Sequence, residues 1–260
     1  RYDIVKQWSW GNSDSPKIYH DPETRKNSIS FRSNMARLAE QLINEGESLK
    51  AKEIIDLAIE KMPIDKFGYY SLIVPFIDNY YRISEIKLAQ SLATKISKKY
   101  SGRLNYFSSL KTGFQYEMGE EIVTEIERYR TLMEAILVNK DKVILESEID
   151  RFIESTKPFI FLYGEYDYYT SLLDMVDGYY LIDSNKKAEK IGNKILDVYK
   201  KRLNVFINLS PENKVQYAEQ IKNEILDFKY FVEIISSNEK GEFSDKIEKE
   251  YNLIIDEFKK

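Results

Sequence analysis

A tyrosine-rich run is the stretch of this chain whose residue types could do chemistry. Residues 163–169 read YGEYDYY and combine Tyr163, Tyr166 and Tyr169 with two carboxylates, Glu165 and Asp167. A tyrosine has a flat apolar face and a hydrogen-bonding tip, so this mixture suits sugars or extended peptides. Two carboxylates in an aromatic cleft could also hydrolyse a glycosidic bond. The run therefore predicts either a binding surface made by the three tyrosines or a glycan-modifying enzyme site.

Other reactive groups are scarce. His20 beside Asp21 is the one pair that resembles an acid–base couple, but a histidine next to a helix-capping aspartate is more often a surface residue. The chain has one histidine and no cysteine, which excludes disulfides, thiolate metal sites and cysteine nucleophiles. It has no phosphate-binding glycine loop and no nucleophile elbow. We therefore expect no catalytic residue, no metal and no cofactor, with the carboxylate enzyme as the alternative.

The composition limits the partners. Charged residues make up 32% of the chain and balance to a net charge of −4, which argues against nucleic acid as a partner. No apolar run approaches the roughly 18 to 20 residues that cross a bilayer, so we expect a soluble piece. The chain opens on Arg1 without an initiator methionine or a signal-like segment, which indicates a portion of a longer protein. Ten glycines and six prolines leave little material for a sheet protein.

The elements that position these groups follow a helical repeat pattern. Residues 35–63 place large, small and turn residues at the spacing of a tetratricopeptide repeat, namely Leu38, Ala39, Leu42, Gly46, Ala51, Ile55, Ala58 and Pro63. Leucine and isoleucine form the seam between two antiparallel helices, and alanine stands where their backbones approach closely. Gly46 can take the positive φ that ends the first helix. One hairpin cannot bury both of its apolar faces, so further hairpins must pack beside it.

An internal match supports this interpretation. Residues 69–110 align without a gap on residues 168–209, and the shared residues are hard to obtain from helix composition alone. They include the pairs Tyr69/Tyr168, Tyr70/Tyr169, Asp78/Asp177, Tyr80/Tyr179, Tyr81/Tyr180, Ala89/Ala188, Tyr100/Tyr199, Arg103/Arg202 and Phe107/Phe206. The match predicts a duplicated unit of two hairpins. Its tyrosines could pack in the core or contact a ligand, and packing is the favoured explanation.

The predicted fold is all-α, a tetratricopeptide-like superhelix of about five antiparallel helical hairpins in one repeat domain over residues 28–260. The expected helix pairs are 28–45 with 48–62, 67–83 with 85–110, 115–138 with 143–156, 158–182 with 185–209, and 211–235 with 242–258. The second helix of the second pair either overruns the usual length or breaks at Ser101-Gly102. The last pair should act as a cap, because its final helix carries charged residues on its outer face.

Residues 1–27 differ from the rest and are expected to form an irregular N-terminal segment with one short piece near residues 2–8. Asp21 is the predicted helix cap, with Pro22 in the first turn. The segment holds both tryptophans, Trp8 and Trp10. We expect them to pack on the first hairpin and cover its open end.

Four sequence stretches also carry a resemblance: RYDIVKQWSWGN, IYHDPETR, residues 30–63 and NYYRISEIKLAQ. Over residues 1–110 the chain resembles the C-terminal soluble region of bacterial protein O-mannosyltransferase-like membrane glycosyltransferases, formerly a domain of unknown function. The resemblance implies that the catalytic part is an upstream multispanning membrane region. The matching positions are Arg1, Asp3, Trp8, Trp10, Gly11, Asn12, Tyr19, Asp21, Arg25, Asn34, Arg37, Leu38 and Ala39.

The polar members of that set, Asp21, Arg25, Asn34 and Arg37, are candidates for tying the N-terminal segment to the first hairpin or to the upstream membrane domain. Taken together, the sequence predicts a non-catalytic binding or scaffold domain that presents a concave surface to a protein, peptide or glycan partner. The resemblance implies a membrane-attached parent glycosyltransferase, with this domain on the extracytoplasmic side.

Overall fold

The computed structural model describes residues 2–259, and these residues form helices, turns and irregular segments with no strand. The predicted all-α class is therefore confirmed. The chain divides into two compact units, residues 1–144 and 145–260, each with its own internal contacts. No helix among the described residues is both long enough and apolar enough to span a membrane.

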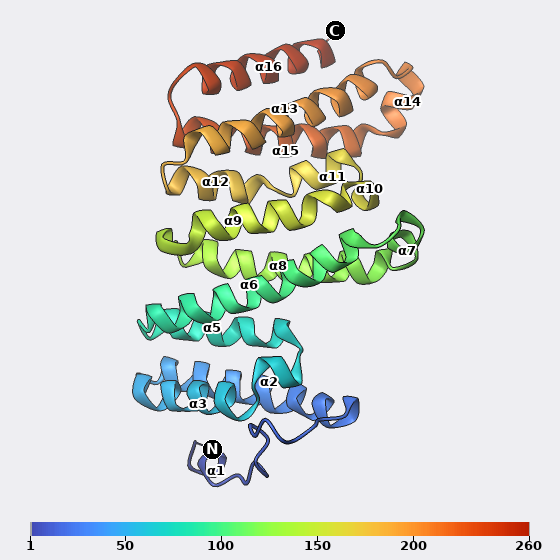
Figure 1. The fold of residues 1–260 in the computed structure, drawn as a ribbon. Coiled ribbons are helices and arrows are strands. Elements are labelled where there is room, and N and C mark those ends of the chain that lie inside the picture. Colours follow the sequence, from blue (N-terminus) through green and yellow to red (C-terminus); the bar gives the residue numbers. More distant parts are fainter. Residues whose placement is uncertain (1, 260) are drawn as a thin grey trace. The chain divides into compact units, whose positions relative to one another are not determined.

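The first unit is built from pairs of long helices. In Figure 1 helices α2 and α3 lie side by side, as do α5 and α6, and α6 also packs against α8. The elements are α1 (Tyr2–Lys6), α2 (Pro22–Asn44), α3 (Ser48–Lys61), α4 (Ile64–Phe67), η1 (Tyr70–Ile73), α5 (Val74–Arg82), α6 (Ile86–Ser109), α7 (Thr112–Glu117), α8 (Gly119–Val138) and the first residues of α9 (Lys142–Thr156).

The second unit continues in the same manner. Helix α13 lies against α11, α12, α15 and α16, so it is the central helix of this unit (Figure 1). After α9 the elements are η2 (Lys157–Phe159), α10 (Ile160–Tyr163), α11 (Glu165–Thr170), α12 (Leu173–Leu181), α13 (Asn185–Ile207), α14 (Pro211–Gln216), α15 (Ala218–Asn238) and α16 (Glu242–Phe258).

The boundaries of the first hairpin follow the predicted residues. The Asp21 carboxylate accepts hydrogen bonds from the backbone N–H of Glu23 and Thr24, so α2 begins at Pro22, six residues before the predicted start. Gly46 has φ +79° in the turn after this helix. Ala51 is fully buried, as the predicted helix seam requires. These contacts confirm the cap and the turn that the sequence indicated.

Several long predicted helices are instead broken. The predicted helix 158–182 is divided among η2, α10, α11 and α12, and the predicted helix 67–83 is divided among the end of α4, η1 and α5. Gly68 and Gly164 end the short helices α4 and α10 with φ values of +66° and +82°, a conformation that stops a helix. Helix α6, in contrast, runs without a break through Ser101 and Gly102. The periodicity of apolar residues did not reveal these short interruptions.

The duplicated tyrosines are mostly buried. Tyr80, Tyr100 and their counterparts Tyr179 and Tyr199 are at most 4% exposed, which confirms packing for these positions. The hydroxyl groups of Tyr80 and Tyr179 each donate a hydrogen bond of 2.6 Å to an aspartate, Asp56 and Asp150 respectively. Burial also raises the pKa of both phenols, and the adjacent carboxylates add to this effect.

A buried arginine that the sequence did not single out fixes the end of the first hairpin. Arg32 of α2 is fully buried and donates hydrogen bonds to the carbonyl oxygens of Met62 (2.7 Å) and Gly68 (2.6 Å). These carbonyls lie at the C-terminal ends of α3 and α4, where the helices leave backbone acceptors unpaired. Burial lowers the pKa of Arg32 to about 10. The residue therefore joins α2 to two helix ends.

Candidate functional site

The N-terminal segment is fastened to the first hairpin at its start. Near the N-terminus, Lys6 forms an ion pair of 2.8 Å with Glu53 of α3, and the Tyr2 hydroxyl donates a hydrogen bond to the same carboxylate. The hydrogen bond that Lys6 donates to Glu53 is the main reason that the pKa of Lys6 is raised, and the same bond lowers the pKa of Glu53. The contact holds α1 against α3.

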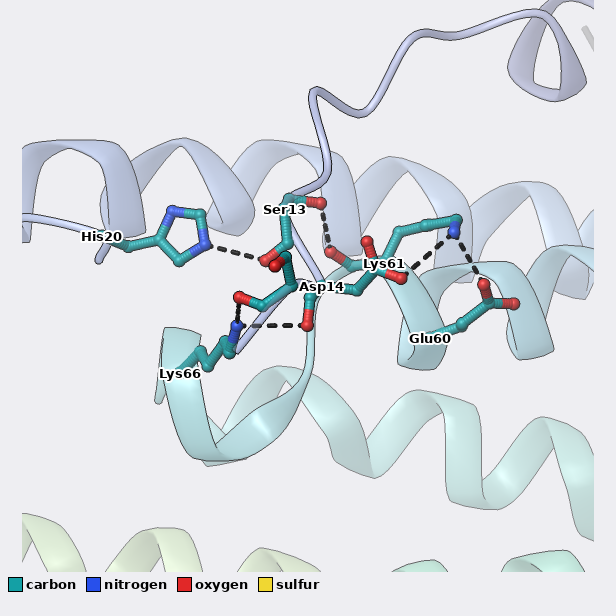
Figure 2. Close-up of polar contacts among 7 residues, drawn as sticks. Ser13, Asp14, His20, Glu60, Lys61 and Lys66 are labelled. Carbon is teal, nitrogen blue, oxygen red and sulfur yellow. Dashed lines mark hydrogen bonds and ion pairs between the residues drawn. The ribbon is translucent and has the colours of Figure 1, made fainter. Parts of the chain in front are cut away.

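A second set of contacts holds the middle of the segment (Figure 2). The Ser13 hydroxyl donates a 2.6 Å hydrogen bond to the carbonyl of Lys61, the last residue of α3, and so satisfies one of its unpaired helix-end acceptors. The Lys61 ammonium pairs with Asp14 at 3.3 Å. The Lys66 ammonium donates to the backbone carbonyls of Asp14 (3.1 Å) and Ser15. Both lysines thus bind the loop that contains Asp14 and Ser15.

His20 completes this attachment. Its Nε2 atom lies 2.8 Å from the Ser13 carbonyl, as Figure 2 shows, and its ring packs on Phe67 with centroids 4.4 Å apart. The side chain is buried, and Arg25 Nε donates a 3.0 Å hydrogen bond to the His20 carbonyl. The residue is thus a structural link between the loop and helices α2 and α4, and it is buried, in contrast to the surface position that the sequence favoured. No cluster of metal-ligating side chains occurs among the described residues.

An aromatic cleft lies between the fastened segment and α2. The ring centroids of Trp8 and Trp10 are 5.8 Å apart, and both rings contact Phe31 of α2, at 5.3 and 6.1 Å. These contacts confirm that the tryptophans pack on the first hairpin. The cleft has a volume of about 610 Å³ and is lined by Trp8, Ser9, Trp10, Gly11, Ser13, Ile18, Tyr19, His20, Thr24, Asn27, Ser28, Phe31, Met62 and Phe67.

The cleft has an uncharged lining. It contains no aspartate, glutamate, lysine or arginine, although the chain as a whole is 32% charged. Tyr19 and Phe31 are 79% and 41% exposed, so aromatic surface is presented to solvent. Aromatic side chains with a few hydroxyl and amide groups are typical of small-molecule binding sites. We call this surface the aromatic cleft.

The four polar residues predicted as site residues have separate positions. Asp21 is the helix cap described above, and hydrogen bonding to Thr24 lowers its pKa. Arg25 lines another cavity of the first unit. Asn34 and Arg37 are exposed on α2 and line a cavity of about 360 Å³ beside α1. Of the four, the structure shows Arg25 tying the N-terminal segment to α2, through the His20 carbonyl.

The predicted tyrosine site lies in the second unit. Tyr166 packs edge-on against Tyr199 with centroids 5.7 Å apart, and Tyr169 packs against Tyr168 at 5.2 Å. Tyr163 is half-buried in α10. Tyr166 and Tyr169 thus take part in packing. The neighbouring carboxylates, Glu165 and Asp167, do not have the arrangement of a catalytic pair. Glu165 is exposed and pairs with Lys201 at 3.1 Å, and Asp167 is exposed as well.

The aromatic cleft was only partly foreseen. The sequence indicated that Trp8 and Trp10 contact the first hairpin, but it treated them as a cover and not as walls of a cleft. Phe31 gave no separate signal because it lies in an ordinary helical pattern. The one usable sign was the separation of two tryptophans by a single residue in a segment that otherwise lacks apolar periodicity. Comparison with known proteins finds no family model, no curated protein and no solved structure that matches the chain.

Proposed function

We propose that this chain is a non-catalytic binding domain that holds a neutral glycan in the aromatic cleft. The observation that carries this proposal is the uncharged, aromatic lining of a 610 Å³ space. Sugars present patches of C–H groups that pack on indole and phenyl faces, and the cleft offers Trp8, Trp10 and Phe31 for that purpose. A charged peptide would find no ionic partner on these walls.

Polar groups at the cleft could receive sugar hydroxyls. Ser9 and Asn27 line it with exposed side chains that both donate and accept hydrogen bonds. Asn27 lies on α2, and the loop that follows Ser9 is fixed at Ser13 and His20, so the walls are already ordered before a ligand arrives. Such preorganisation reduces the entropy lost on binding.

The wider assignment rests on the sequence. We propose a tetratricopeptide-like array built on a duplicated unit, attached to a membrane glycosyltransferase-like parent on the extracytoplasmic side, with the upstream membrane domain as an intramolecular partner. Matching helices support the duplication, since α5 (Val74–Arg82) and α12 (Leu173–Leu181) lie 99 positions apart, and each comes two elements after a short helix that ends at a glycine. A glycan-binding domain beside such an enzyme would keep acceptor or product glycans near the membrane.

Intrinsic fluorescence tests the cleft directly, because its two tryptophans are the only ones in the chain. We expect neutral manno-oligosaccharides to change the emission in a saturable titration. Trp10→Ala should weaken binding at least tenfold, measured by calorimetry. Tyr230→Ala removes an aromatic ring that is 55% exposed on α15 and should leave affinity unchanged.

Two outcomes would overturn the proposal. Saturable binding of an uncharged peptide, with no binding of any oligosaccharide, would reassign the cleft to protein recognition. Equal affinity of the Trp10→Ala variant and the original protein would place the glycan elsewhere. Hydrolysis by Glu165 and Asp167 has no comparable structural support, because both side chains are exposed.

A further inference from the structure

A second cavity in the first unit has a different chemical character. It has a volume of about 400 Å³ and lies where α2, the α4–η1 turn, α6 and α8 meet. It is lined by Pro22, Arg25, Phe67, Gly68, Tyr69, Tyr70, Ser71, Tyr100, Arg103, Glu125 and Arg128. We call it the arginine pocket. Its volume is within the range of small-molecule sites.

Two buried polar atoms in this pocket have no protein partner. The Tyr100 hydroxyl and Glu125 Oε1 accept and donate no hydrogen bond within the described structure, although both residues are only 1% exposed. Burial raises the pKa of both side chains. A buried polar atom without a partner is costly and uncommon. A ligand that offers hydrogen-bond donors would satisfy both atoms.

Three arginines line the same pocket, Arg25, Arg103 and Arg128. Arg103 and Arg128 approach the other carboxylate oxygen of Glu125, at 3.5 and 3.8 Å, and both side chains are about half exposed. Arg103 also donates a hydrogen bond to Glu121 through its other terminal nitrogen, whereas the long contact of Arg128 leaves its guanidinium donors available to a stronger acceptor. Arg25 is held through Nε by the His20 carbonyl, which fixes its orientation at the rim. Three cations and one carboxylate favour an anionic ligand.

The rim of the pocket is a shaped turn. Gly68 and Tyr69 both have positive φ values, +66° and +49°, and the second is unusual for a residue with a side chain. The turn directs Tyr70 edge-on against Tyr100, with centroids 5.8 Å apart and planes at 88°. Backbone strain of this kind persists where the surrounding structure fixes it, and it often accompanies a binding site.

The second unit provides an internal comparison. Arg202 and Glu224 stand 99 positions after Arg103 and Glu125, and they form a direct hydrogen bond of 3.0 Å. The position that corresponds to Arg128 holds Asp227. Tyr166 lies under the Arg202 guanidinium, 5.5 Å from ring centroid to Cζ. The arrangement is therefore similar, but an anion, Asp227, stands at the position of the second cation, and the Arg202 guanidinium covers Tyr166.

We infer that the arginine pocket binds a small anionic sugar, one that carries a phosphate or a carboxylate group. The oxyanion is held by Arg103 and Arg128, with Arg25 at the rim, because planar guanidinium groups match such anions with paired hydrogen bonds. Sugar hydroxyls donate to Glu125 Oε1 and bond with the Tyr100 hydroxyl. This inference goes beyond the proposed function, and it does not depend on a ligand in the aromatic cleft.

Calorimetric titration with four probes tests the pocket: glucose 6-phosphate, glucuronate, inorganic phosphate and glucose. We expect one of the two anionic sugars to bind at least tenfold more tightly than both glucose and inorganic phosphate, and the tighter one identifies the acidic group. Equal binding of inorganic phosphate and glucose 6-phosphate would mean a simple anion site and would overturn the inference. No binding above that of glucose would overturn it too.

Matched variants locate the binding. Arg128→Gln should lower the affinity at least tenfold without a change in Tm, because the side chain is 51% exposed and makes one weak ion pair. Arg128→Lys keeps the charge but loses the planar fork, so an intermediate affinity is expected. Lys229→Gln removes the same charge from a 56% exposed side chain of α15 and should bind normally. Unchanged affinity in Arg128→Gln contradicts the assignment.

Discussion

The arginine–glutamate pair of the first unit and the pair of the second unit differ in what surrounds them. Arg103 approaches Glu125 loosely at 3.5 Å and faces an open pocket, whereas Arg202 is hydrogen-bonded to Glu224 at 3.0 Å and stacks over Tyr166. The two arginines nevertheless each lie near the phenylalanine four residues later, at 5.7 and 5.1 Å from the ring centroid. The same scaffold can thus hold either an exposed cationic site or a packed aromatic contact.

The difference arises in the connection that precedes the matching helices α5 and α12. Ten positions separate Gly68 from Asp78, but thirteen separate Gly164 from Asp177. The longer connection forms α11, and Tyr166 then makes the edge-on contact that Tyr70 makes in the first unit. The ungapped alignment pairs Tyr70 with Tyr169 instead. Three additional residues therefore change which aromatic ring meets the buried tyrosine.

Removing the arginines should give the largest effect and should separate the two regions. We expect Arg202→Ala to lower the free energy of unfolding by about 2 kcal/mol, because it removes the ion pair of a largely buried Glu224 and two ring contacts. Arg103→Ala should cost about 1 kcal/mol, because Glu125 keeps Arg128 and the ion pair lost with Glu121 is about half exposed. Urea denaturation measures both values. A greater loss for Arg103→Ala would show that the first pair is the tighter one.

The equivalent tyrosines Tyr80 and Tyr179 should contribute equally to the stability of the two units. Tyr80→Phe and Tyr179→Phe each remove a 2.6 Å hydrogen bond to a carboxylate, so each should lower the free energy of unfolding by about 1.5 kcal/mol. The same denaturation measurement applies. A difference of more than about 1 kcal/mol between the two variants would mean that the two contacts are not equivalent.

Much of the fold could be predicted from the sequence, for identifiable physical reasons. The Asp21-Pro22 start and the Gly46 turn act through local backbone chemistry, so they could be recognised from residue types alone. The short interruptions at Gly68 and Gly164 could not, because a glycine within an apolar pattern is also compatible with an unbroken helix.

The candidate sites were harder to predict because they depend on contacts between distant residues. Glu125 and Arg128 belong to a regular helical pattern, and their charges would ordinarily indicate a solvated face. Only the packing of α6 against α8 buries Glu125 beside Tyr100. Arg25 was selected through the family resemblance, and the structure places it at the rim of this pocket. The sequence contains these residues, but it does not indicate that they lie close together in the fold.

A small residue on the central helix offers a further comparison. Gly192 of α13 corresponds to the fully buried Ala93 of α6. A Cβ atom at Gly192 would lie 2.9 Å from the ring of Phe243, so that ring would have to move. We expect Gly192→Ala to lower the free energy of unfolding by about 1 kcal/mol, because overpacking outweighs the gain in helix propensity. An increase in Tm would show that Phe243 moves freely.

Protonation of Glu125 should give the smallest effect. It tests whether Arg103 and Arg128 fully offset the cost of burying the ionised carboxyl. Burial raises its pKa above the ordinary value of 4.5, although the neighbouring Arg103 and Arg128 act in the opposite direction and Glu121 adds to the rise. A raised folded-state pKa means that the contribution of the proton to stability is complete below pH 4.5 and is lost as the pH rises through the folded-state value. Burial also raises the pKa of Tyr100, the other buried titratable group of the pocket, so its phenol stays neutral throughout this range.

The Glu125→Gln variant allows the effect of Glu125 protonation on stability to be measured. The amide carries no charge at any pH, so the variant avoids the cost that the ionised carboxyl imposes at pH 7.5. We expect the Tm of the variant relative to the original protein to be higher at pH 7.5 than at pH 4, where the glutamate itself is protonated. Thermal denaturation followed by circular dichroism at the two pH values gives this difference. If the variant instead loses relative stability at pH 7.5, the arginines compensate the carboxylate fully, and the Glu125 oxygen would have less need of a ligand.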